Sequence, residues 1–178
     1  MFTKNKLPFS KILQWCLKEP SSHFACVFML TPKHGVVVHQ RFNGFTVNFL
    51  HNFLEKNDVV AAIKPKTTNL KMEKRIFLAL MNRYDGTEYD FKGLLYFCWR
   101  VVLLKLVNAP IPKVNRWGSN KEPICTGVSN EIRTIKPDWF SEDFIDGDII
   151  TPWRLYLMMM GTGKFEDIKT DGSSSRII

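Results

Sequence analysis

The chain has 178 residues, of which 45% are apolar and 24% are charged. These proportions are close to those of ordinary globular proteins, so they exclude intrinsic disorder and a largely membrane-embedded protein. The length favours one domain with a substantial hydrophobic core. The formal net charge of +8 would attract nucleic acid or an anionic membrane surface, but the basic residues are scattered rather than gathered in a dense arm. We therefore expect no specific nucleic-acid partner.

The first third of the chain predicts one helix followed by a β-hairpin. Ser10 is expected to cap a short amphipathic helix that Pro20 ends. Runs rich in β-branched and aromatic residues then predict a strand from His23 to Leu30 and a second from Val36 to Phe42. A third strand is expected near Phe45 to Val47, which completes a small antiparallel arrangement.

The middle of the chain predicts a short helix, a further strand and two longer helices. Their expected bounds are residues 48–56, Val59–Ile63, Asn69–Tyr84 and about Asp90 to Leu106. The last of these helices is nearly all apolar, but Arg100 and Lys105 interrupt it, and it is shorter than the roughly 20 residues that cross a bilayer. We interpret it as a buried helix.

The last third of the chain predicts an exposed loop, two short helices and a tail. The expected segments are a loop at Asn108–Pro123, a helix from Cys125 to about Arg133, an irregular acidic stretch at Pro137–Pro152, a helix at Trp153–Met160 and a flexible tail at 161–178, of which about the last ten residues are expected to be disordered. The fold class is therefore predicted to be α+β, with a small antiparallel sheet flanked by helices in one domain of residues 1–160.

Four cysteines, at positions 16, 26, 98 and 125, form no Cys-x-x-Cys pair. Without such a pair, or a regular spacing to histidine, they predict neither a structural zinc site nor a disulfide framework. The first residues show no apolar run followed by a cleavage site, so no secretory signal is indicated. The cytoplasm is then the default compartment, with delivery outside the cell by another route left open.

Cys125 is the strongest candidate for a nucleophile. It follows the predicted loop and begins a predicted helix, where the positive end of the helix dipole lowers a thiol pKa and backbone N–H groups form an oxyanion hole. Cys26 lies in the strand that starts at His23, and the alternation of strand side chains places these two on opposite faces. Cys16 and Cys98 lie in apolar helices, where cysteine is usually a buried hydrophobe. On local grounds alone, a structural role for Cys125 stays open.

His23 has the best position for the base among four histidines, because a strand end holds a side chain rigidly and keeps it accessible. His34 is expected in the hairpin turn, and His51 on the surface of the short helix. A third polar group must orient the base, and His39 and Asn43 are the candidates.

The expected register of the hairpin bears on this third group. If the turn centres on Lys33, position 39 pairs with position 27, which is about 13 Å along the strand from His23. In that register Asn43 lies opposite His23. The third member therefore stays open between His39 and Asn43 on the spacing alone.

Four short motifs carry a family resemblance, and they occur in order across about residues 10 to 158. They are Ile12-Leu-Gln-Trp-Cys-Leu-Lys-Glu-Pro-Ser-Ser-His23, Tyr89-Asp-Phe-Lys-Gly-Leu-Leu-Tyr-Phe97, Ile124-Cys125-Thr-Gly-Val-Ser-Asn-Glu-Ile and Thr151-Pro-Trp-Arg-Leu-Tyr156. Together they resemble circularly permuted papain-like cysteine hydrolases of the NlpC type, in which the histidine precedes the cysteine. Thr126 and Gly127 depart from the Ser and Glu that usually follow the cysteine in that family.

The pair of His23 and His39 is similar to the histidine, strand, turn, strand, histidine arrangement of the lecithin retinol acyltransferase branch, and this likeness favours His39 over Asn43. The resemblance implies a peptidase or amidase in which Cys125 attacks a carbonyl and His23 protonates the leaving group. It implies no metal or organic cofactor. The implied substrates are peptides or amides such as cell-wall peptides, or, as an alternative on the same fold, lipid esters and thioesters.

A noncatalytic alternative stays open beside the enzyme. The altered residues after Cys125 keep open the alternative of a binding module for an anionic partner. In that reading the positive charge and three aromatic residues taken as exposed, Trp117, Trp139 and Trp153, make the contacts.

Overall fold

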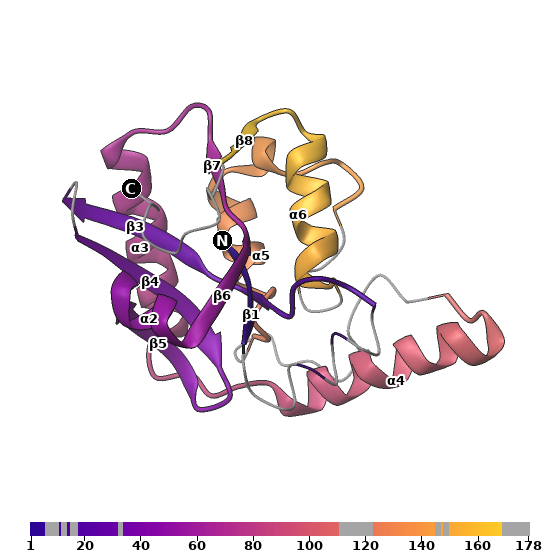
Figure 1. Cartoon of the computed structure of the whole chain (residues 1–178). Helices are drawn as coiled ribbons and strands as arrows, with labels where there is room; N and C mark the ends of the chain where they lie inside the picture. The colour runs from indigo at the N-terminus through magenta and orange to yellow at the C-terminus, as the bar shows by residue number, and fades with distance from the viewer. Residues whose placement is uncertain are drawn as a thin grey trace.

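The structure is a computed structural model that describes residues 1–5, 11, 14, 18–31, 34–110, 123–144, 147 and 150–168. The helix expected from Ser10, most of the loop expected at 108–123 and the last ten residues lie largely or wholly outside this part of the chain. The described residues form five α-helices and eight strands, and the strands lie in three small antiparallel sheets. The prediction of an α+β class is confirmed (Figure 1).

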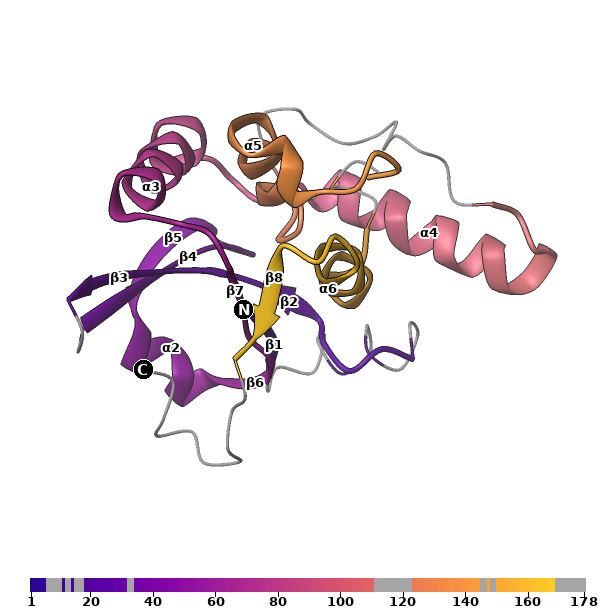
Figure 2. The same cartoon turned by 90° about the horizontal axis from the view of Figure 1, so that it is seen from above.

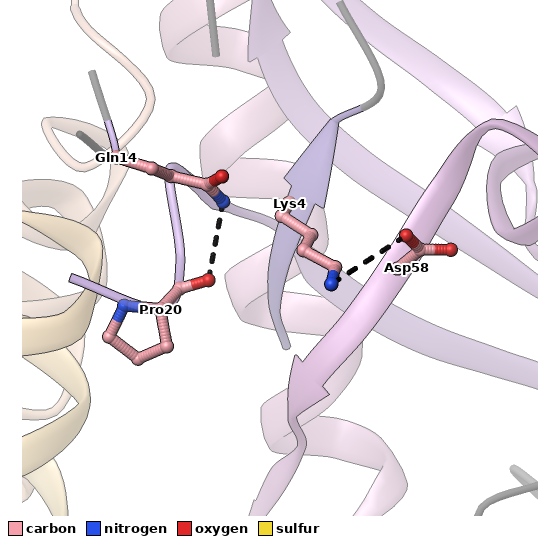
Figure 3. Close-up of polar contacts among 4 residues, drawn as sticks. All are labelled: Lys4, Gln14, Pro20 and Asp58. Atoms are coloured by element: carbon pink, nitrogen blue, oxygen red, sulfur yellow. Dashed lines mark hydrogen bonds and ion pairs between the residues drawn. The ribbon is translucent and has the colours of Figure 1, made fainter. Parts of the chain in front are cut away.

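One sheet has the strand order β2-β1-β6 and contains the N-terminal residues. Its strands are β1 (Phe2–Asn5), β2 (His23–Phe24) and β6 (Asn57–Ala61). Lys4 and Asp58 are cross-strand partners, and their Nζ and Oδ2 atoms lie 4.0 Å apart (Figure 3). In the same view the Gln14 amide donates to the Pro20 carbonyl at 3.3 Å, just before the chain enters β2. The sequence prediction missed β1, because four residues are too few to show a period.

The second sheet holds the predicted hairpin and the third strand, in the order β3-β4-β5. These strands are β3 (Cys26–Thr31), β4 (His34–Arg41) and β5 (Gly44–Phe49). Phe42 and Asn43 form the turn between β4 and β5. Gly44 follows at φ 105°, where a Cβ atom would meet the Thr87 carbonyl oxygen at 2.7 Å. Glycine is therefore required at the point where this turn meets the chain after α3.

The register between β3 and β4 differs from the expected one by two residues. Val27 pairs with Val37, so the prediction that position 27 lies opposite position 39 is wrong. Two causes add to this difference. Thr31 pairs with His34, whereas a turn centred on Lys33 would pair position 31 with position 35, and this accounts for one residue. An irregularity between Met29 and Thr31 shifts the pairing by one more residue. Extended along β4, this register places position 39 beside position 25, only two residues from His23.

Helices cover both faces of the second sheet. Figure 2 shows α2 (Leu50–Lys56) on one side, and α3 (Leu70–Tyr84) and α5 (Val128–Ile135) on the other. The helix α6 (Pro152–Gly161) packs beside β1. The predicted α3 is confirmed, and the side chain of its N-cap, Asn69, accepts from the Met72 amide at 2.9 Å.

Two apolar clusters correspond to the two faces. The larger joins the strands to α3, α5 and α6, and includes Phe24, Val38, Leu80, Val128, Ile132 and Leu155. The smaller lies under α2 and consists of Met1, Ala25, Val37, Leu50, Phe53 and Ala62. Because strand side chains alternate, neighbouring residues such as Phe24 and Ala25 belong to different clusters.

The apolar helix is α4 (Phe91–Val107), and its N-cap is Asp90, whose carboxylate accepts from the Gly93 amide at 2.7 Å. The bounds agree with the prediction, but the interpretation of α4 as a buried helix is wrong. Leu95 is 64% exposed and Leu106 is 75% exposed, and the helix extends outward from the rest of the molecule (Figures 1 and 2). Among the described residues, no helix combines the length and apolarity needed to cross a membrane.

The third sheet consists of β7 (Ile63–Pro65) and β8 (Phe165–Asp167). The strand predicted at Val59–Ile63 is therefore divided between β6 and β7. Phe165 is only 4% exposed and packs edge-on against Trp139, with ring centroids 5.4 Å apart. The expected flexible tail from residue 161 is thus replaced, up to residue 168, by the end of α6 and by β8.

The short 3₁₀ helix η1 (Pro137–Trp139) places Trp139 in the core at 6% exposure. The expectation that Trp139 is exposed for contact with a partner is therefore wrong. Trp153 is partly buried and stacks on Tyr156 at 4.6 Å, and Trp117 lies outside the described residues.

Candidate functional site

The structure brings His23 and His39 into direct contact. The His23 Nε2 and His39 Nδ1 atoms lie 2.8 Å apart, and the two rings meet edge to face with centroids separated by 5.0 Å. The observed register helps to explain the contact, because His23 lies only two residues before Ala25, the position beside His39, and both residues face the smaller cluster. The two rings come from different sheets, β2 and β4.

Asn48 of β5 completes this group, which we call the histidine relay and define as His23, His39 and Asn48. The Asn48 amide nitrogen lies 3.1 Å from His39 Nε2. Asn43, the alternative third residue, lies in the β4–β5 turn instead. Sequence reasoning missed Asn48, although a two-residue turn at Asn43-Gly44 would have placed position 48 opposite position 39. The observed turn at Phe42-Asn43 instead pairs His39 with Thr46, which makes Asn48 the diagonal neighbour of His39 on the same face.

The surroundings of the relay keep both imidazoles neutral at pH 7. Phe53 of α2 packs edge-on against His39, with ring centroids 4.8 Å apart, and also lies near His23. Burial, and then the positive charge of Arg41, lower the pKa of His23 to about 4. Burial lowers the pKa of His39 to about 2, with His23 and Arg41 adding to the effect. A neutral imidazole is the form that accepts a proton.

The hydrogen bonds of the relay link the tautomers of the two rings. With the Asn48 amide nitrogen donating to His39 Nε2, His39 donates from Nδ1 to His23 Nε2, and the His23 proton sits on Nδ1. A 180° rotation of the Asn48 amide presents its oxygen and reverses every donor, which leaves His23 Nδ1 as a free acceptor. The orientation of one amide therefore decides whether His23 Nδ1 carries the proton or is free to accept one.

Cys125 lies in a turn that precedes α5, and it is 8% exposed. The predicted helix is confirmed, but it begins at Val128 rather than at Cys125. The Gly127 amide donates to the Ile124 carbonyl at 3.0 Å, and the Ser129 amide donates to the Thr126 carbonyl at the same distance. These successive turns lead directly into the helix, so Cys125 stands near its N-terminal end.

Two hydrogen bonds connect the Cys125 turn with the segment that leads to His23. The Thr126 hydroxyl donates to the Ile150 carbonyl at 3.0 Å, and the hydroxyl of the next residue, Thr151, donates to the Glu19 carboxylate at 2.8 Å. Burial raises the pKa of Glu19. The segments that contain the motifs at 12–23, 124–132 and 151–156 are therefore tied to one another in space.

The two faces of the sheets separate Cys26 from the histidine relay. Cys26 packs with the larger cluster, whereas the His23 ring faces Phe53 of the smaller one, so the prediction that Cys26 and His23 point to opposite faces is confirmed. Burial also raises the pKa of the Cys26 thiol to about 11, which suppresses its thiolate. Helix α5 packs in the larger cluster through Val128. The pairing of Cys125 with His23 stays a prediction.

The other candidate residues stand apart from the relay. His34 is exposed at the start of β4 and its Nδ1 atom lies 3.1 Å from the Thr31 hydroxyl, while His51 is exposed on α2. Cys98 packs beside Tyr89, Leu94 and Ile124, and Cys16 lies outside the described residues. Within the part of the chain that the structure describes, no three side chains of His, Cys, Asp or Glu converge as ligands for a metal ion.

Comparison of the chain with protein-family models, with curated proteins and with solved structures gives no match.

Proposed function

We propose that the protein is a cysteine hydrolase of circularly permuted papain-like type, with Cys125 as nucleophile and His23 as its base. The histidine relay is the observation that carries this proposal. A catalytic imidazole needs a fixed ring orientation and a defined tautomer, and a polar neighbour bonded to its distal nitrogen supplies both. The bonds of 2.8 Å and 3.1 Å from His23 through His39 to Asn48 have that form.

The proposed reaction proceeds through an acyl-enzyme. His23 takes the thiol proton of Cys125 at Nδ1, which is the free acceptor when the Asn48 oxygen faces His39, and the thiolate attacks the substrate carbonyl carbon to form a C–S bond. The bond to the leaving nitrogen or oxygen breaks as His23 returns the proton to it. Water, deprotonated by the same imidazole, then attacks the thioester, releases the acid and restores the thiol. His39 and Asn48 act as positioning residues, because neither touches the reacting atoms in this scheme.

The lowered pKa of His23 supports a role as a general base, rather than a resting ion pair between a Cys125 thiolate and a protonated His23. With both imidazoles neutral, the pair would not hold Cys125 as a thiolate before substrate binds, and the proton would move during attack. The position of Cys125 before α5 adds the positive end of the helix dipole, which favours the developing thiolate. Peptides and amides are the proposed substrates, with lipid esters or thioesters as the alternative on the same apparatus.

Alkylation of Cys125 by iodoacetamide across pH tests this proposal. The wild type is compared with His23→Ala, and with His34→Ala as a matched control that removes an exposed histidine outside the relay. Mass spectrometry of the peptide that contains Cys125 separates it from the other three cysteines. We expect alkylation of Cys125 to be about tenfold slower in His23→Ala and unchanged in His34→Ala.

Two results would overturn the proposal. One is an equal alkylation rate of Cys125 in the wild type and in His23→Ala at every pH. The other is a rate for Cys125 that rises only near pH 8.5, as for an ordinary thiol, because a base within reach shifts that rise to lower pH. Unchanged far-UV circular dichroism of both variants shows that the comparison concerns folded protein.

A further inference from the structure

Helix α4 has two apolar faces, and only one of them is buried. Leu94, Phe97 and Val101 are between 5% and 8% exposed and form the inner face. On the opposite side, Leu95 is 64% exposed, Trp99 52%, Val102 40% and Leu106 75%. Burial of the inner face therefore accounts for only part of the hydrophobicity of this helix, and the outer face needs a separate explanation.

The exposed residues form one continuous stripe. We define the α4 stripe as Leu95, Trp99, Val102 and Leu106, which follow one another at intervals of four, three and four residues. Such intervals align side chains along one side of a helix. Phe91, 55% exposed, stands one turn before Leu95 and lengthens the same side. The helix itself extends outward from the body of the molecule (Figure 2).

The charges of α4 all have one sign. Its 17 residues include Lys92, Arg100 and Lys105 and no acidic residue. Lys92 is exposed and stands three residues before Leu95 and seven before Trp99, so it borders the stripe. The whole chain carries a formal net charge of +8. An occupant of the stripe must therefore be apolar at its centre and negatively charged at its margin.

We propose that the α4 stripe binds the surface of a membrane that contains anionic phospholipids, with the helix lying in the plane of the interface. Apolar side chains then enter the region between headgroups and acyl chains, while Lys92 at the border of the stripe contacts phosphate and carboxylate groups. Arg100 lies away from the stripe and donates to the Pro110 carbonyl at 2.6 Å. Trp99 suits this position, because an indole ring favours the boundary between water and lipid. This proposal goes beyond the hydrolase chemistry and does not depend on it.

A second copy of the chain fits the stripe less well than a membrane does. The spacing of the stripe would allow two helices to pack against each other. Two copies of α4 would, however, each bring Lys92 to the border of the contact, and neither helix has an acidic residue to pair with it. Like-charge pairs weaken such an association.

Co-sedimentation with lipid vesicles tests the proposal. One set of vesicles is phosphatidylcholine alone and the other contains about one third phosphatidylserine. We expect the full chain to bind the second set of vesicles. High salt should release it, because salt screens the electrostatic attraction between basic side chains and anionic headgroups. The variant Leu95→Glu/Leu106→Glu should bind about tenfold more weakly. The matched control is Leu157→Glu on α6, where the leucine is 54% exposed outside the stripe.

Depth of insertion gives an independent readout. Lipids with brominated acyl chains should quench the tryptophan fluorescence of the wild type, and this quenching should be largely lost in Trp99→Phe while sedimentation persists. The proposal is overturned if the wild type binds neither set of vesicles, or if Leu157→Glu weakens binding as much as the stripe variant. It is also overturned if the stripe mediates only a dimer, seen by ultracentrifugation and abolished in Leu95→Glu/Leu106→Glu.

Discussion

The pH dependence of folding stability follows from the histidine relay. An unfolded histidine titrates near pH 6.5, whereas burial holds the pKa of His23 at about 4 in the folded chain. Between these values the unfolded state binds a proton that the folded state does not, so the free energy of unfolding falls as the pH is lowered from about 6.5. Above pH 6.5 this contribution is complete and constant.

The magnitude can be worked out for an accessible range of pH. One proton changes the free energy of unfolding by about 1.4 kcal/mol per pH unit, so His23 alone accounts for a loss of about 2 kcal/mol between pH 6.5 and pH 5. His39, whose pKa is lowered in the same direction, adds to the loss. Urea unfolding followed by circular dichroism at several pH values measures the sum.

The variant His23→Gln isolates the contribution of His23. Glutamine can keep a hydrogen bond to His39 but does not titrate, so the slope between pH 5 and pH 6.5 should decrease by about one proton relative to the wild type. The control is His34→Gln, which makes the same substitution at an exposed site outside the relay. If the slopes of wild type and His23→Gln are equal, the buried neutral state of His23 is refuted.

Three further predictions concern the relay and the core. Asn48→Ala removes the 3.1 Å contact with His39 and should slow the alkylation of Cys125 about tenfold, with a loss of only about 1 kcal/mol of stability in urea unfolding; an unchanged rate would remove Asn48 from the relay. Leu80→Ala, at a side chain with 0% exposure, should cost about 3 kcal/mol, whereas Leu78→Ala, 47% exposed on the same helix, should cost less than about 1 kcal/mol. Gly44→Ala places a Cβ 2.7 Å from a carbonyl oxygen at φ 105° and should lower the thermal midpoint by more than about 5 °C; an unaltered midpoint would contradict that close approach.

Local sequence patterns predicted the long elements of the fold. The period of apolar residues placed α3 and α4 to within a few residues. Strands β1 and β8 were missed, since each is too short to show a pattern and forms only through its partner. Local patterns also gave α4 the wrong environment, because hydrophobicity does not tell a helix with one exposed face from a helix buried on all sides.

The histidine pair shows how far register limits prediction. Both histidines were identified from the sequence, but their distance depended on a turn and an irregularity that together moved the pairing by two residues. Asn48 was missed because it joins His39 from a third strand, and cross-strand neighbours are set by register rather than by sequence proximity. The first residue of α5 is similarly set by the turn at residues 125–127, and the local sequence around Cys125 did not predict that turn.

The relay also joins two sheets that are otherwise separate hydrogen-bonded systems. His23 belongs to the sheet of β1, whereas His39 and Asn48 belong to the sheet of β4, and the chain passes from one sheet to the other at Ala25. A relative shift of the sheets by one ångström would stretch the 2.8 Å bond between the rings beyond hydrogen-bonding range. The orientation of His23 is therefore sensitive to packing at Ala25, because this residue lies at the junction of the two sheets and belongs to the same apolar cluster as Phe53.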